Sequence, residues 1–234
     1  MTVPRATRPR SGAAVRAMSG QRLERPVPTA QRVAALLRAQ ISDGALPPGS
    51  QLVEESLAEA LGVSRNTVRE GFALLVGERI VDRFPSRGVF VATPGAADVK
   101  DLYQARMMVE ATAVRWGQAP DEETLRLMRT CVEQARGCRD EQDWAGVALA
   151  NQNFHRAIAS LTRSERTTAW FASLLAQLRL VFARIADRSF HATYIDDNAR
   201  VLAALESGDR EVATCCLVDY LERARDDVLA RLTT

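Results

Sequence analysis

Residues 57–70 constrain the fold more than any other stretch of this sequence. Leu57 and Leu61 give an apolar helical face before Gly62, whose missing Cβ permits the positive φ of a tight turn. A second helix is predicted to follow, with Ser64 as its N-cap and polar or basic side chains in its first turns. Proteins that insert a second helix into the DNA major groove have this order. The alternative is an ordinary helical hairpin with a solvated, charged face.

The segments on either side of this motif complete a small domain. Residues 30–42 carry apolar side chains at helical spacing, and the Gly/Pro-rich run 44–49 ends that helix. Behind the motif, the β-prone runs 77–84 and 89–92 flank a Pro/Gly turn and predict a hairpin. We therefore expect a winged helix-turn-helix at residues 29–93, with the small β-hairpin as its wing.

Residues 44–92 resemble the DNA-binding domain of the GntR family of bacterial regulators. The matching positions follow the family order: Pro48-Gly49, Leu57-Ala58, Gly62-Val63-Ser64-Arg65, Val68-Arg69-Glu70 and Arg87-Gly88. Two positions depart from the pattern. Glu55 stands where relatives often carry Arg and would repel a phosphate, and Asn66-Thr67 replaces a frequent Thr-Pro pair. The operator sequence therefore cannot be copied from a relative.

The resemblance implies that this domain contacts double-stranded operator DNA. The contacts that it assigns fall on Ser64, Arg65, Asn66, Thr67, Arg69 and Gly88. Arg87, next to Gly88 at the wing tip, adds a cation that can reach a phosphate or the minor groove. Since the formal net charge of the chain is only +2, binding must depend on local placement of these arginines and not on a broad basic field.

Residues 1–28 differ in composition from the rest, with six arginines against the single Glu24. They predict a disordered basic arm, and the alternative is a translated leader upstream of a second start at Met18. This segment lacks the apolar stretch of a secretory signal, and no run in the chain is long enough to span a bilayer. We therefore expect a cytoplasmic bacterial protein that is nucleoid-associated when DNA-bound, with no membrane partner.

The four cysteines show no metal-binding spacing; they are Cys131, Cys138, Cys215 and Cys216. Adjacent cysteines do not readily bridge each other, and all four lie in apolar helical patterns. We expect them to fill the core of a protein in a reducing compartment, with a thiol sensor as the alternative.

Beyond a linker at residues 94–97 the pattern is helical only. Six helices are predicted within residues 98–234 and the adjoining linker: about 97–118, 121–139, 144–161, 165–188, 195–207 and 209 to near the C-terminus. The fold class is therefore mainly α, with a winged helix-turn-helix followed by an all-α bundle. A helical bundle can hold a ligand pocket between its helices.

This second half resembles the FCD effector-binding domain of the FadR-like branch of the GntR family, in its six-helix, VanR-like form. The carrying residues are Asp101-Leu102-Tyr103, Arg106, Glu110, Asn151, Phe154-His155, the run 204–209 and Tyr220-Leu221. The resemblance implies a domain that binds a small-molecule effector and forms a homodimer.

Many FCD domains hold a divalent metal with an Asp or Asn four residues before a His, and two later histidines. Asn151 and His155 match the first pair, but Asn198 and Tyr220 occupy the later histidine positions. Zinc sites want at least three strong donors, and a neutral amide or a protonated phenol is a poor substitute. We therefore expect no metal, although zinc remains an alternative and His191, outside the motif, could add a ligand.

The expected effector site is then a metal-free pocket in which Asn151, His155, Asn198 and Tyr220 hydrogen-bond an organic molecule. Arg106 is a candidate to clamp a carboxylate, because a guanidinium offers two parallel donors. Its alternative is an internal ion pair with Glu110, one turn on. The alternative for His155 is an ordinary hydrogen-bonded core histidine.

Enzymatic function is not expected, since the sequence holds no phosphate loop or nucleophile motif and only two histidines. The favoured function is a sequence-specific transcription regulator, most often a repressor in this family, whose DNA affinity responds to an effector. The alternative is a constitutive DNA-binding regulator whose effector site has been lost.

Overall fold

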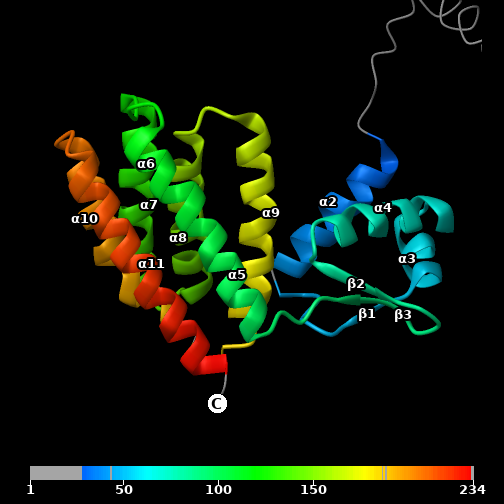
Figure 1. Ribbon diagram of the computed structural model, residues 1–234. Coiled ribbons are helices and arrows are strands. Elements are labelled where there is room, and N and C mark those ends of the chain that lie inside the picture. Colours follow the sequence, from blue (N-terminus) through cyan, green and yellow to red (C-terminus); the bar gives the residue numbers. More distant parts are fainter. Residues whose placement is uncertain (1–27, 43, 186, 188, 233–234) are drawn as a thin grey trace, which may run out of the picture.

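The chain forms a winged head followed by a helical bundle (Figure 1). The computed structural model describes residues 28–42, 44–185, 187 and 189–232, so the predicted arm lies outside them except for Pro28. The head contains α2 Thr29–Ser42, β1 Gln51–Leu52, α3 Glu54–Leu61, α4 Arg65–Gly77, β2 Val81–Phe84 and β3 Gly88–Val91. The bundle contains α5 Ala96–Arg106, the π-helical turn η1 Met107–Ala111, α6 Thr112–Trp116, α7 Glu122–Asp140, α8 Trp144–Ser160, α9 Glu165–Phe182, the 3₁₀ turn η2 Phe190–Tyr194, α10 Ile195–Glu206 and α11 Arg210–Leu232.

The head confirms the winged helix-turn-helix. Gly62 ends α3 with φ at +63°, and the Ser64 side chain caps α4 by accepting the Thr67 N–H. The sheet has three antiparallel strands in the order β1-β3-β2, and β1, which the sequence analysis missed, is only two residues long. Side chains of α2, α4 and the sheet share one apolar core, which includes Val33, Leu37, Val68, Phe72, Leu75, Val81 and Val89.

The bundle follows the predicted helices with two differences. The first helix is continuous through α5, η1 and α6, but its middle is a π-helical turn. The fourth helix, α9, ends at Phe182 and not near residue 188. The chain turns there, and this turn lets Ile185 and Phe190 both pack into the bundle core.

The cysteine prediction holds for one residue and fails for another. Cys131 is buried in the bundle core, whereas Cys215 is exposed on α11, and Cys138 and Cys216 are partly buried. Cys215 lies on the exposed face of α11, whose buried positions include Thr214 and Leu217. In the described part of the chain, no helix is both long enough and apolar enough to cross a membrane.

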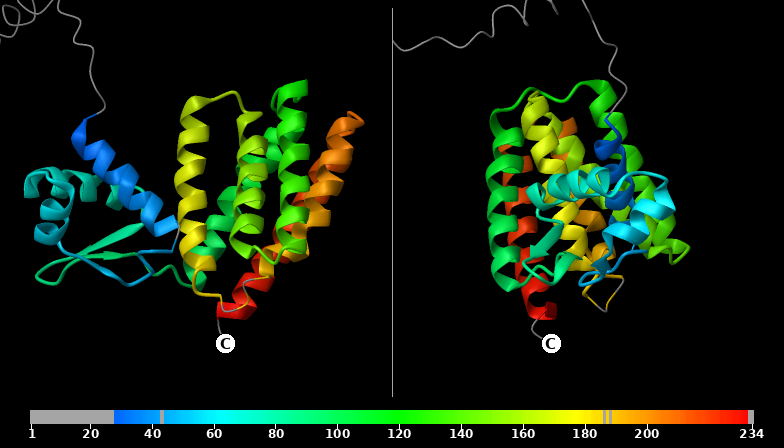
Figure 2. Two further views of the ribbon diagram at one scale, coloured as in Figure 1. Left: turned by 180° about the vertical axis from the view of Figure 1, so that it is seen from behind. Right: turned by 90° about the vertical axis from the view of Figure 1, so that its right-hand side faces the viewer.

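The head packs on the bundle through α2 and α9, which lie side by side in two views (Figures 1 and 2). Leu180 of α9 belongs to the apolar core of the head. The Arg179 guanidinium donates to the Ser42 carbonyl at the end of α2, with its Nε 3.1 Å from that oxygen. Arg184 similarly donates to the Pro94 carbonyl. These hydrogen bonds hold the head against the C-terminal end of α9.

Candidate DNA-binding and effector sites

The DNA-contacting side chains assigned to α4 gather in its first turns and are mostly exposed. Ser64 is engaged in capping: its Oγ lies 3.1 Å from the Thr67 nitrogen and 2.8 Å from the Thr67 hydroxyl. Asn66 donates to the Glu70 carboxylate at 2.8 Å. α3 and the tip of the β2–β3 hairpin both lie at the end of the head farthest from the bundle (Figure 1). This end of the head therefore carries the residues that the resemblance assigns to DNA.

Both arginines of this surface are paired with glutamates from the start of α3. Arg69 donates to Glu54, with Nη2 and Oε2 2.9 Å apart, and this hydrogen bond lowers the pKa of Glu54. Arg65 forms an ion pair with Glu55. Glu55 was expected to repel phosphate. In the free protein its negative charge is paired with the positive charge of Arg65. Both pairs are largely exposed, so they hold the arginines only weakly.

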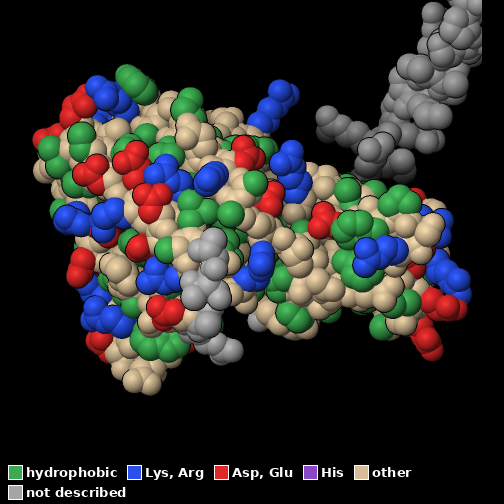
Figure 3. Space-filling model, turned by 60° about the horizontal axis from the view of Figure 1, so that its bottom comes forward, with side chains coloured by type: hydrophobic (Ala, Val, Ile, Leu, Met, Phe, Trp, Pro, Cys, Tyr) green, Lys and Arg blue, Asp and Glu red, His purple; other side chains and the backbone are tan. Residues whose placement is uncertain are grey.

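The wing tip holds Arg87 in a defined place. Its guanidinium lies 5.5 Å from the Phe84 ring centroid and 5.9 Å from that of Phe90, within range of cation–π attraction. Gly88 has φ at +104°, a conformation that favours glycine. Gln51 of β1 donates to the Arg87 carbonyl at 3.3 Å and so connects the tip to the sheet edge. Cationic and anionic side chains are intermixed on the face that Figure 3 shows, without a broad basic field.

The five side chains predicted for the effector site lie in one buried chain of hydrogen bonds in the bundle. We call it the polar network: Arg106, Glu110, His155, Tyr220, Asn151 and Asn198. Along it the distances are 2.7 Å from Arg106 Nε to Glu110 Oε1, 2.5 Å from Glu110 Oε2 to His155 Nδ1, and 2.8 Å from His155 Nε2 to the Tyr220 hydroxyl. Asn151 Oδ1 then lies 3.2 Å from that hydroxyl and 2.8 Å from Asn198 Nδ2. Every member is at least nine-tenths buried.

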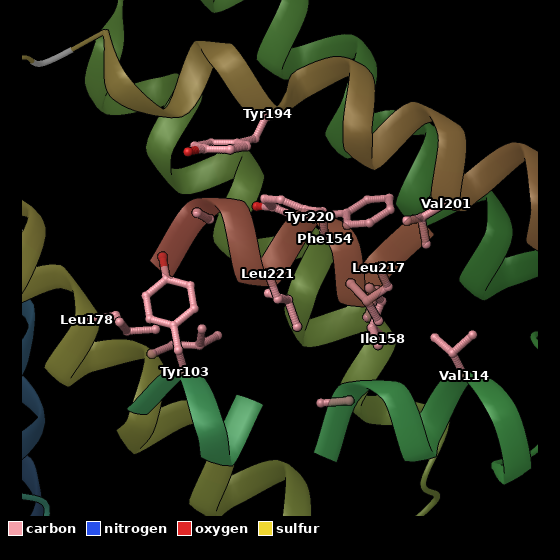
Figure 4. Packing of buried hydrophobic residues seen from close by; sticks show 14 of the residues in the cluster. Tyr103, Val114, Phe154, Ile158, Leu178, Tyr194, Val201, Leu217, Tyr220 and Leu221 are labelled. Carbon is pink, nitrogen blue, oxygen red and sulfur yellow. The ribbon is translucent and has the colours of Figure 1, made fainter. Parts of the chain in front are cut away.

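Four elements bring the polar network together: the continuous helix of α5 and η1, together with α8, α10 and α11. The π-helical turn carries Glu110, and α8 places Asn151 and His155 one turn apart on one face. Tyr194 of η2 stacks on Tyr220 with ring centroids 5.1 Å apart, and Figure 4 shows the two rings facing each other. A buried helix face from each element thus contributes one or two polar groups to an otherwise apolar core.

Burial and charge fix the protonation of the network. Burial works to raise the pKa of Glu110, but the charge of Arg106 and the hydrogen bonds from His155 and Arg106 outweigh it, so that pKa is lowered. Burial is the largest influence on His155 and lowers its pKa, helped by Arg106 and opposed by Glu110. Burial also raises the pKa of Tyr220. The network therefore contains an ionised Arg106–Glu110 pair, a neutral histidine and a protonated phenol.

The neutral histidine leaves the hydroxyl proton of Tyr220 with one partner. When Nδ1–H of His155 donates to Glu110, Nε2 is an acceptor, and the Tyr220 hydroxyl donates its hydrogen bond to it. Asn151 Oδ1 then depends on Asn198 for its hydrogen bond. Two buried polar atoms of the network have no partner among the described residues: Arg106 Nη2, a donor, and Asn198 Oδ1, an acceptor. A buried polar atom without a partner is costly, so these two atoms mark the place where a ligand would gain most.

The network does not suit a metal ion. His155 has both ring nitrogens within hydrogen-bond distance of neighbours, and Glu110 is paired with the buried Arg106. A cation bound there would face the positive guanidinium in a medium of low dielectric constant. Within the described residues, no cluster of three or more His, Cys, Asp or Glu side chains could hold a metal. His191 lies in η2, packs on Phe182, and does not join His155 in such a cluster.

From the sequence, Glu110 was expected only as an alternative partner for Arg106. Its contact with His155 spans 45 residues of sequence, and no local pattern predicts such a contact. Tyr103 and Tyr194 were not considered as neighbours of the site. The Arg106 guanidinium lies 5.2 Å from the Tyr103 ring centroid, and the Tyr194 hydroxyl donates to Asp227. The family motif identified the polar residues, but the aromatic wall around them required the structure.

Known proteins match the chain over both halves. Residues 29–91 match the family described as "Bacterial regulatory proteins, gntR family", and residues 101–223 match the FCD domain. The Uxu operon regulator of Haemophilus influenzae is 27% identical over 84% of this chain and 80% of its own length.

Solved structures show the same architecture. A GntR transcriptional regulator from Rhodococcus sp. RHA1 is 37% identical, covers 87% of this chain and 99% of its own, and has a TM-score of 0.80. Escherichia coli McbR/YncC shares the fold at 22% identity and a TM-score of 0.72, covering 88% of this chain and 99% of its own. The chain therefore belongs to the GntR family of DNA-binding transcription regulators, in the FadR-like subfamily with a C-terminal FCD domain, and is not an enzyme.

Proposed function

We propose that this regulator is a cytoplasmic homodimeric repressor whose affinity for a specific operator is changed by an organic effector bound, without metal, at the polar network. The observation that carries the proposal is the pair of unpartnered buried atoms, Arg106 Nη2 and Asn198 Oδ1. An effector with a carboxylate for Arg106 and a donor group for Asn198 would satisfy both atoms. The Gluconate operon transcriptional repressor of Bacillus licheniformis, 23% identical, supports repression as the mode of action.

Dimerisation is supported by the exposed apolar side chains of the bundle. Trp116 is 72% exposed, Met108 65% and Leu149 52%, and large apolar groups are more stable when buried against a partner. A dimer would also double the cationic contacts to DNA. Sedimentation equilibrium of the full chain measures the mass directly, and a monomer at micromolar concentration would contradict this part of the proposal.

The effector hypothesis is tested on DNA binding. The operator is first selected from a random duplex library, and its affinity is then measured by fluorescence anisotropy with a panel of small carboxylic acids that carry a hydroxyl or amino group. An effector should change the affinity by about 5- to 150-fold, the usual range of allosteric coupling. Asn198→Leu should reduce that response, because it removes the Oδ1 acceptor that the effector's donor group needs. If no compound changes DNA affinity, the constitutive regulator is the better description.

Elemental analysis of the purified protein tests the absence of metal. Less than a tenth of an equivalent of transition metal is expected, even after Zn²⁺ is offered and the excess removed. A stoichiometric metal that disappears in His155→Gln would instead place an ion in the network and contradict the hydrogen-bonded effector site.

A further inference from the structure

A cavity lies between the head and the bundle, and no residue of the polar network lines it. We call it the junction pocket. Its volume is about 570 Å³, within the range of small-molecule sites. The head contributes Ser42, Gly44 and Pro47, and the bundle contributes the start of α8, the end of α9 and η2. A ligand in this pocket would contact both parts of the molecule at once.

One buried polar side chain that lines the junction pocket forms no hydrogen bond with any residue that the structure describes. His191 is 6% exposed and packs edge-on against Phe182 at 4.4 Å between ring centroids. Among the described residues neither ring nitrogen has a hydrogen bond. Burial, with smaller contributions from Arg179 and Arg106, lowers the pKa of His191 to about 3. Its neutral ring therefore offers one unused donor and one unused acceptor.

The other charged groups among the described lining residues already have hydrogen-bond partners. Asp143 caps α8 by accepting the Gly146 N–H at 3.0 Å, and Asp187 accepts from the Ser189 backbone N–H at 3.0 Å. Arg179 donates to the Ser42 carbonyl. Since these bonds remain with the protein, a ligand would find its main polar contact at His191. That ligand needs one oxygen function and not several charged groups.

The walls of the pocket favour a flat ring. Trp144, Phe182 and Phe190 line it, and the Phe182 and Phe190 rings lie 5.8 Å apart. Aromatic rings prefer offset or edge-on neighbours at such separations.

We propose that the junction pocket binds a small monocyclic aromatic compound with one hydroxyl or carboxylate group, whose oxygen bonds His191 while its ring lies among Trp144, Phe182 and Phe190. Bound there, it also contacts the loop after α2 and stabilises one placement of the head against α9. This site is additional to the effector site proposed above. η2 connects the junction pocket with the polar network. The ring centroids of Phe190 and Tyr194 lie 5.2 Å apart, and Tyr194 stacks on Tyr220 of the polar network.

The test is a titration of the full chain with benzoate and, separately, phenol, followed by tryptophan fluorescence. The chain has three tryptophans, and Trp116 and Trp170 are exposed, at 72% and 50%. Replacing both with Phe leaves Trp144 as the only reporter, inside the pocket. A saturable change of its emission with at least one compound is expected, and the stronger binder distinguishes a carboxylate from a hydroxyl preference.

Three variants in this background locate the binding. His191→Phe keeps the aromatic packing but removes both nitrogens, and it should weaken binding about 2- to 10-fold, the value of one hydrogen bond. Ala145→Phe adds a ring at an exposed position that lines the pocket and should abolish binding. Leu149→Phe, a matched change on the same helix outside the pocket lining, should leave binding unchanged.

A fourth variant separates the two sites. Tyr220→Phe alters the polar network alone and should bind benzoate and phenol as the parent does. The proposal is overturned if neither compound binds saturably, or if binding persists in both His191→Phe and Ala145→Phe. It is also overturned if Tyr220→Phe alone removes binding, which would assign the ligand to the polar network. Circular dichroism of each variant checks that it is folded.

Discussion

At the residue scale, the arginines of α4 that the family resemblance assigns to DNA are already paired within the protein. Arg69 is held by Glu54, and Arg65 by Glu55, before any DNA arrives. A phosphate or base edge must therefore compete with a carboxylate for each guanidinium. Pre-pairing of this kind weakens binding to every sequence alike, and it also points each arginine in a defined direction.

Arg69→Ala should weaken operator binding by about 1–3 kcal/mol if Arg69 reads a base, and relax sequence preference at that position. Fluorescence anisotropy with the selected operator and a scrambled duplex measures both effects. Arg126, an arginine of the bundle, gives the matched control, because Arg126→Ala should change neither. Unchanged affinity in Arg69→Ala would contradict the assignment of α4 as the recognition helix.

Glu55→Gln should strengthen DNA binding by up to about fivefold at low salt, because an exposed charge pair is worth about 0.2–1 kcal/mol. The change frees Arg65 from its ion pair and removes a negative charge next to a side chain that is assigned to DNA. The gain should shrink at higher salt, since these charges are exposed to solvent. Glu59→Gln on the same helix is the control, with a smaller gain expected. Weaker binding by Glu55→Gln would instead show that Glu55 positions Arg65 productively.

At the element scale, the π-helical turn η1 is the unusual feature of the bundle. Such turns often occur at functional sites. Here the turn carries Glu110, which contacts both Arg106 and His155. A turn of this kind changes the direction of side chains along a continuous helix, and so allows one carboxylate to serve partners on two elements.

Arg106→Leu should lower the free energy of unfolding by about 3–5 kcal/mol, because it leaves the buried Glu110 charge without its ion-pair partner. Adding Glu110→Leu to the same chain should recover part of that loss. Urea unfolding followed by circular dichroism measures both variants. If the double variant is as unstable as the single one, the loss comes from packing and not from an uncompensated charge.

The sequence predicted the helices and turns correctly where local chemistry determines them. Gly62 and Ser64 fix the turn of the head through backbone conformation and capping, and both act within a few residues. The strand β1 was missed, because two residues give no periodic signal. The π-helical turn and the end of α9 were also missed. Both depend on tertiary packing, as Ile185 and Phe190 illustrate, and not on a helix-breaking residue.

For the candidate sites, prediction from the sequence relied on the family motif. It identified Asn151, His155, Asn198 and Tyr220, which the structure brings into one network. It did not reveal that these side chains already bond one another, nor that His191 lines a separate cavity. Contacts between residues far apart in sequence decide both points, and single-sequence periodicity carries no information about them.

At the scale of the whole molecule, both histidines are buried and both have a lowered pKa. Each is neutral in the folded chain but takes up a proton in the unfolded chain below its ordinary pKa near 6.5. The unfolded state therefore binds more protons as the pH falls, and the folded state loses stability. The stabilising effect of high pH is complete above about pH 6.5 and is lost progressively below it.

His191 alone should remove about 2 kcal/mol of stability between pH 7 and pH 5, since its folded-state pKa is about 3 and each pKa unit corresponds to about 1.4 kcal/mol. His191→Phe should remove about 2 kcal/mol from the pH dependence of the free energy of unfolding, because phenylalanine does not titrate. Urea unfolding at pH 7 and pH 5 measures this free energy. Trp116→Phe, at an exposed site, should keep the wild-type dependence. An unchanged pH profile in His191→Phe would mean that the pKa of His191 is not lowered in the folded chain, and the junction pocket would then lack the neutral imidazole that its proposed ligand requires.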